Sequence, residues 1–94
     1  MRLSDLHEKK DVSAKPLAES LSAKVTAIQI LAGKLLKEHI TTIPAVLICV
    51  IGEVVYEDEK GNSINLKPGD FKEIEPMVKH WVKGIRDAQL VLIK

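Results

Sequence analysis

The 94-residue sequence has few aromatic residues, one cysteine and no excess of charge of one sign. Lys and Arg number 14 and Asp and Glu 13, for a formal net charge of +1, so neither nucleic acid nor an anionic membrane is expected as a main partner. The lone Cys49 cannot form an internal disulfide, which is typical of a reducing compartment. The longest apolar run, from Ala45 to Ile51, is far too short to cross a bilayer, and the polar first residues do not resemble a signal peptide. We therefore expect a cytoplasmic protein.

The chain is rich in aliphatic residues. Hydrophobic residues make up 46% of it, mostly Val, Ile and Leu, and its aromatic residues are Tyr56, Phe71 and Trp81. That apolar content suffices for one small domain spanning 1–94, with a thin margin over chain entropy. Because the pairing of two copies would bury more of this surface, we expect a homodimer.

Turn-forming residues divide the sequence into short segments and predict an all-β fold. Glycine and proline recur at intervals of about 8–12 residues, the spacing typical of many short strands. The Gly61-Asn62 pair predicts a hairpin loop, and Pro68-Gly69 predicts a tight turn. The segment from Ala45 to Ile51 is apolar at every position, which predicts a strand buried on both faces. On this interpretation residues 25–94 form the barrel.

The region before Gly33 supports two interpretations. Apolar residues near helical spacing would allow an amphipathic helix over 17–35: Leu17, Leu21, Val25, Ile28, Leu31 and Leu35. The β-branched residues of this region disfavour that helix. A short helix or turn over 16–23 followed by a strand from Val25 satisfies both signals. Residues 1–15 are expected to form a polar arm in which His7 is exposed.

Two segments resemble the motifs of the cupin superfamily. The first, GKLLKEHITTIPAVLICVIG, has five residues between Gly33 and His39 and closes on Gly52. The second, PGDFKEIEPMVKHWVKG, leads from a Gly-Asp turn to His80, eleven residues after Gly69. The resemblance covers about 70 residues and implies a cupin-type β-barrel, or jelly roll, in which His39 and His80 face one interior pocket.

The departures from these motifs bear on function. The metal sites of the family generally use two histidines and a glutamate from the first motif and a histidine from the second. Here Thr41 stands at the second histidine and Ala45 at the glutamate, so two of four ligands remain. Catalytic zinc sites usually keep three protein ligands. We therefore expect no tightly bound metal. If a divalent transition metal is bound, His39 and His80 are its remaining ligands, and Cys49 could add a thiolate. The simpler interpretation is that Cys49 is a small buried core residue.

Three functions follow as hypotheses. In the first, which we favour, His39, Thr41, His80 and Trp81 bind a small polar or carboxylated molecule without a metal. In the second, the chain is a metal-dependent enzyme of the dioxygenase or isomerase type with an atypical site. In the third, the barrel is structural or regulatory, because inward-facing Ala45, Leu47, Cys49 and Ile51 fill its interior. Fold resemblance alone does not choose among them.

Overall fold

Strands account for most of the fold. The computed structural model describes residues 3–19 and 23–94, and within them a short 3-10 helix, η1 (Leu3–Leu6), precedes seven strands. These are β1 (Val12–Glu19), β2 (Lys24–Ile30), β3 (Leu35–His39), β4 (Ala45–Asp58), β5 (Ser63–Leu66), β6 (Phe71–Ile74) and β7 (His80–Ile93). The predicted all-β fold is therefore confirmed. Among the residues described, no helix has the length and apolar character needed to cross a membrane.

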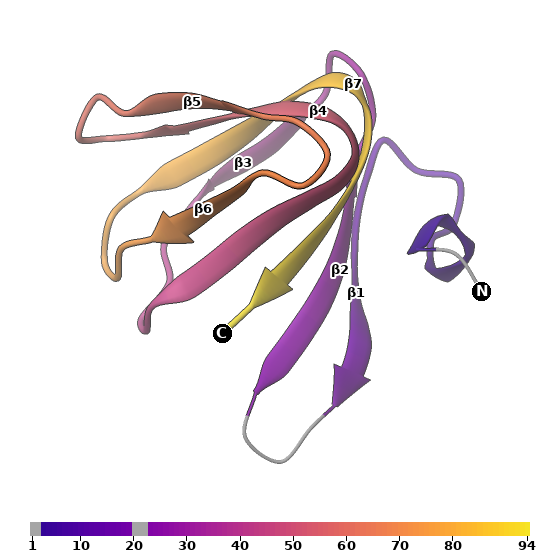
Figure 1. Ribbon diagram of the computed structural model, residues 1–94, viewed down its shortest axis with the longest axis horizontal. Coiled ribbons are helices and arrows are strands. Elements are labelled where there is room, and N and C mark those ends of the chain that lie inside the picture. The colour runs from indigo at the N-terminus through magenta and orange to yellow at the C-terminus, as the bar shows by residue number, and fades with distance from the viewer. Residues whose placement is uncertain (1–2, 20–22) are drawn as a thin grey trace.

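The long strands β4 and β7 pair with each other along almost their whole length and bend together, so each contributes to two layers (Figure 1). The first half of β4 and the second half of β7 join β6, β2 and β1 in one layer. The second half of β4 and the first half of β7 join β5 and β3 in the other. All of these pairings are antiparallel.

Gly52 allows β4 to bend. Its φ is +85°, in the left-handed region, and a Cβ placed on it would lie 2.2 Å from the carbonyl oxygen of Asp87 on β7. An L side chain would be strained there by its backbone angle and would also clash with a backbone atom. The glycine that closes the first motif is thus required by the close approach of the two bent strands.

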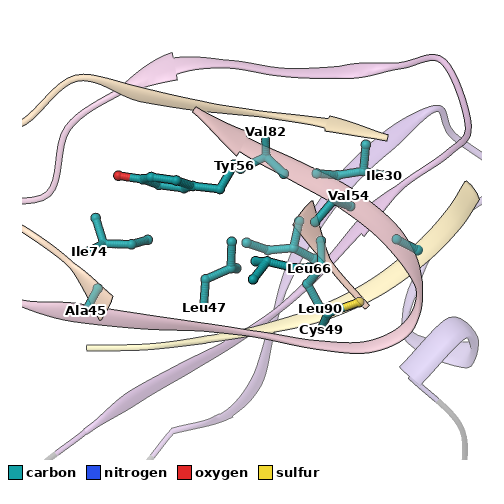
Figure 2. Close-up of a cluster of buried hydrophobic side chains, with 12 residues drawn as sticks. Ile30, Ala45, Leu47, Cys49, Val54, Tyr56, Leu66, Ile74, Val82 and Leu90 are labelled. Atoms are coloured by element: carbon teal, nitrogen blue, oxygen red, sulfur yellow. The ribbon is translucent and has the colours of Figure 1, made fainter. Parts of the chain in front are cut away.

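The core fills the space between the layers. Figure 2 shows side chains from both layers meeting there, with the ring of Tyr56 lying across one end of the cluster. The fully or almost fully buried members include Ile30, Leu47, Cys49, Val54, Leu66, Val82 and Leu90. The centre of the barrel is therefore packed with apolar side chains, as the third hypothesis expects.

The prediction that the segment from Ala45 to Ile51 is buried on both faces is wrong. Ala45, Leu47 and Cys49 are buried, but the alternate residues face outward and Val50 is exposed. Irregular pairing on both sides of Ile51 also ends the strict alternation, and that side chain is 57% exposed and does not face the interior. The outer face of this strand segment is apolar although it is not fully covered. Sequence periodicity cannot distinguish an apolar face that is exposed from one that is buried.

The N-terminal region also differs from expectation. The helix over 17–35 is excluded, because β1 continues to Glu19 and β2 begins at Lys24. Part of the short helix or turn predicted over 16–23 is strand, and residues 20–22 lie outside the described residues, whereas the strand predicted from Val25 is found as β2. The predicted arm of residues 1–15 contains η1 and the first part of β1, so the sheet begins well before Val25. His7 is half-buried and its Nδ1 lies 2.8 Å from the hydroxyl of Ser13.

The predicted turns are found where glycine marks them. The hairpin between β4 and β5 contains Gly61 at φ +87°, and the turn before β6 contains Gly69 at φ +93°. The loop before β7 is less usual, because Met77 has φ +64°. A left-handed backbone angle is uncommon for any residue other than glycine, so this loop is strained at Met77.

Candidate functional site

His39 and His80 meet at the open end of the barrel, which is the end away from the bends of β4 and β7. The end of β3 pairs with the start of β7 in a register that sets His39 opposite His80. Their Nε2 atoms are 3.0 Å apart, and their rings lie edge to face with centroids separated by 4.2 Å. His80 is fully buried and His39 half-buried. The predicted convergence of the two histidines is therefore found.

Backbone carbonyl groups determine which ring nitrogens carry protons. Nδ1 of His39 lies 2.9 Å from the carbonyl oxygen of Lys37, and Nδ1 of His80 lies 3.1 Å from that of Val78. A carbonyl oxygen only accepts, so each Nδ1 donates, and each neutral ring then has a lone pair on Nε2. Two lone pairs at 3.0 Å form a hydrogen bond only when a proton lies between them. The histidine pair, His39 and His80, thus presents two converging acceptors that require a proton or a donor group.

Tyr56 and Asp58 support His80 from the neighbouring strand. The Tyr56 ring stacks on His80 at 5.7 Å between centroids, and its hydroxyl donates to Oδ2 of Asp58 at 3.0 Å. Burial favours a higher pKa for Asp58, but hydrogen bonds from Asn62, Tyr56 and the Lys60 backbone outweigh it and lower that pKa. Burial and the Asp58 carboxylate raise the pKa of Tyr56. Asp58 is thus an ionised group with its oxygens occupied, which makes it a structural part of the site.

Burial also governs the charge of His80 itself. Desolvation lowers its pKa, the hydrogen bond to the Val78 carbonyl opposes this, and the neighbouring His39 lowers the pKa further. A positive charge on this ring is therefore disfavoured unless an anion or another acceptor comes close.

Thr41 follows His39 by two residues and is buried. Its carbonyl oxygen accepts from the backbone N–H of Met77 at 2.8 Å, which holds the chain after β3 against the loop that leads to His80. Its Oγ1 is inaccessible to solvent and has no hydrogen-bond partner among the residues described. A buried hydroxyl without a hydrogen-bond partner is unfavourable, so a ligand atom that bonds to it would stabilise the site.

Trp81 does not join this group, contrary to the prediction. It follows His80 on the same strand, so its side chain points to the other face of the sheet. There its indole N–H donates to a carboxylate oxygen of Glu57 at 2.9 Å. Because neighbouring residues of a strand point to opposite faces, the two side chains are separated, and that of Trp81 lies on the outer face of the sheet beside Glu57.

The likeness to known proteins lies in the fold. No protein-family model and no curated protein matches the chain. A cupin superfamily protein from Desulfitobacterium hafniense superposes with a TM-score of 0.84 at 18% identity, over 98% of this chain and 84% of that one. An RmlC-like cupin from Methanocaldococcus jannaschii with a double-stranded β-helix fold gives 0.78 at 18% identity, over 94% and 84%. The chain has the cupin fold. At such identities the function has to be argued from the site.

The metal that the cupin resemblance implies does not fit the residues present. Among the described residues, no group of three or more His, Cys, Asp or Glu side chains converges on one point. Glu38 is exposed and lies 3.6 Å from Lys79, and Cys49 is buried in the core, where desolvation raises the pKa of its thiol. Two imidazoles and a threonine hydroxyl fall short of the three protein ligands of a resident catalytic metal. Cys49 is a core residue, and the idea that it completes a metal site is wrong.

A groove of about 640 Å³ adjoins the pair, and His39 forms part of its wall. It lies between β3 on one side and the inner face of β1, β2 and the end of β7 on the other. Sequence reasoning missed this groove because part of its lining comes from β1, whose residues were expected to form a polar arm and a short helix or turn. It also missed Tyr56 and Asp58, although their alternate spacing on an apolar strand indicated that both face inward.

Proposed function

We propose that this cupin binds a small molecule with a hydroxyl or carboxyl group, which interacts with His39 and His80. The observation that carries the proposal is the 3.0 Å approach of the two Nε2 atoms while both Nδ1 atoms are held by carbonyl oxygens. A ligand hydroxyl would donate to these acceptors. A carboxylate would be favoured by a proton held between the two rings, and that proton would in turn be favoured by the carboxylate.

Two further features support the proposal. The buried hydroxyl of Thr41, two residues after His39, has no partner among the described residues and would donate to a ligand oxygen that reaches it. Tyr56 and Val78 hold His80 in place, so the pair is organised before any ligand arrives. The ligand count argues against a resident metal, and binding is therefore proposed without one.

The experiment uses glycolate, which has both a hydroxyl and a carboxylate, with acetate as the simpler probe. The imidazole Hε1 resonances of the three histidines are followed by NMR while each compound is titrated into the full-length protein. His39 and His80 should shift together and reach saturation, and half-buried His7, on the N-terminal segment, serves as the internal control. The His39→Asn variant should lose the saturable shift of His80.

Two outcomes contradict the proposal. One is an absence of saturable shifts at His39 and His80 with both probes. The other is a near-stoichiometric transition metal in protein purified without chelator, lost in the His39→Asn variant, which would show that the pair holds a metal.

The structural or regulatory role is a second candidate, because the centre of the barrel is filled. Leu47, Cys49 and Leu90 occupy the interior and leave it closed to a ligand (Figure 2). In this case the histidine pair would hold the open end of the barrel together. His39→Asn would then lower the melting temperature, and neither glycolate nor acetate would change it in the wild-type protein.

A further inference from the structure

The groove beside His39 has an apolar floor. Its lining includes Val12, Ala14, Ile28, Leu35, Leu36 and Leu92, drawn from both layers of the barrel. Ile28 belongs to the core cluster, and Leu36 and Leu92 pack against that cluster. The floor is thus continuous with the core and held rigidly by it. A volume of about 640 Å³ lies within the range of small-molecule sites.

The strand register shows which end of the groove lies near the bend of the barrel and which lies at its open end. In β1 and β2, Val12 pairs with Ile30 near the bend of the barrel, whereas Lys24 lies at the open end. In β3, Leu35 and Leu36 lie toward the bend, and His39 lies at the open end beside His80. The inner part of the groove is therefore lined mostly by apolar residues, with Asp11 at its far end, and the lysines and His39 lie toward its mouth.

Three lysines lie at the mouth of the groove: Lys24, Lys37 and Lys94. Lys24 and Lys94 exchange backbone hydrogen bonds of 2.9 and 3.0 Å, so they stand directly opposite each other on neighbouring segments. Lys37 lines the groove from β3. Among the side chains that the structure describes, no Asp or Glu carboxylate is within ion-pair distance of Lys37 or Lys94, and Lys24 stands opposite Glu19 in the pairing of β1 with β2. The acidic residue of the lining, Asp11, is paired with Lys34 at 3.4 Å. Like charges directly opposite each other are destabilising, and an anion between them relieves the repulsion.

We propose that the groove binds an aliphatic carboxylate: its apolar chain lies along the floor, and its carboxylate lies at the mouth among Lys24, Lys37 and Lys94, next to His39. This rests on the proposed function and narrows its ligand to a class. The three lysines favour an anion at the mouth, and the floor favours an apolar body of several carbon atoms. Acetate and glycolate would then be incomplete ligands that occupy the mouth alone.

The probe is octanoate, titrated into the full-length protein by calorimetry. Acetate, which has the carboxylate without the chain, and 1-octanol, which has the chain without the charge, are the comparison compounds. Octanoate should bind at least about 50-fold more tightly than acetate, because each buried methylene contributes roughly a fourfold gain and three or more should be buried. It should also bind more tightly than 1-octanol, which has the chain without the charge. Added salt should weaken octanoate binding and leave 1-octanol unaffected.

Matched variants locate the site. Leu35→Ser shortens the floor at an exposed position and should weaken octanoate about tenfold, whereas Ile64→Ser, at a similarly exposed position on β5, should leave it unchanged. Lys37→Gln should weaken octanoate severalfold and leave 1-octanol unaffected. Lys67→Gln, another lysine outside the groove, is its control. All four positions are exposed, so folding should be retained.

The outcomes separate this inference from the proposed function. If acetate and glycolate shift His39 and His80 but octanoate binds no more tightly than acetate, the aliphatic ligand class is wrong and the histidine site stands. If octanoate binds and responds to Leu35→Ser while both histidines stay unaffected by acetate, the groove stands and the role of the pair is wrong. If Leu35→Ser converts a dimer to a monomer in sedimentation and octanoate does not bind, a second copy covers the groove and the inference is overturned.

Discussion

Gly52→Ala tests whether the two-layered barrel depends on the close approach of its bent strands. At φ +85° the alanine would occupy the left-handed region at a cost of about 1–2 kcal/mol. Its Cβ would also fall 2.2 Å from the carbonyl oxygen of Asp87, and moving β7 away would cost a further 1–3 kcal/mol or so. The expected loss of roughly 2–5 kcal/mol is a large part of the stability of a domain of this size, about 5–14 kcal/mol.

Gly61→Ala is the matched control. Gly61 has nearly the same angle, φ +87°, but a Cβ there would meet no atom within 4 Å, so only the backbone strain of about 1–2 kcal/mol remains. Urea unfolding followed by the fluorescence of Trp81, the one tryptophan, measures both variants. The midpoint should fall by roughly 1–3 M for Gly52→Ala and by clearly less for Gly61→Ala. Equal losses for the two variants would refute the claim that contact with β7 requires a glycine.

Three other predictions concern the open end of the barrel. Met77→Gly should raise the free energy of unfolding by about 1 kcal/mol, since Met77 adopts φ +64° while being exposed; no gain in melting temperature would contradict this. Tyr56→Phe should destabilise the fold by about 1–2 kcal/mol in urea unfolding, because the buried hydroxyl donates to Asp58; a neutral result would show that the bond contributes nothing. Burial lowers the pKa of His80, so the unfolded chain takes up the proton first and stability should fall from pH 7 toward pH 5. His80→Gln should flatten this dependence and leave the part due to His7, whose pKa burial also lowers; an unchanged dependence in urea unfolding would contradict this.

Prediction succeeded where a residue's own chemistry dictates local structure. Gly61 and Gly69 adopt positive φ in the turns that their sequence indicated. The cupin resemblance placed His39 and His80 together, and the pairing of β3 with β7 sets the two residues opposite each other. Thr41 is buried at the same end of the barrel, as its motif position implied.

Prediction failed where the answer depended on what lies on the far side of a strand. Trp81 was expected beside the ligand because it follows His80, yet the pleat places it on the opposite face. The apolar run of β4 predicted two buried faces, but nothing among the described residues covers Val50, which is exposed. Burial depends on neighbours distant in sequence, and periodicity records only the strand's own alternation.

The sequence by itself determined the strand-rich class, the turns and the identity of the two histidines, because these depend on backbone preferences and on motif spacing. The tertiary structure alone decided the rest. It placed carbonyl oxygens against both Nδ1 atoms, so that two acceptors face each other, and it brought β1 and β2 across from β3 to form a lysine-rimmed groove. Such arrangements arise from contacts between segments far apart in the chain, and no local pattern encodes them.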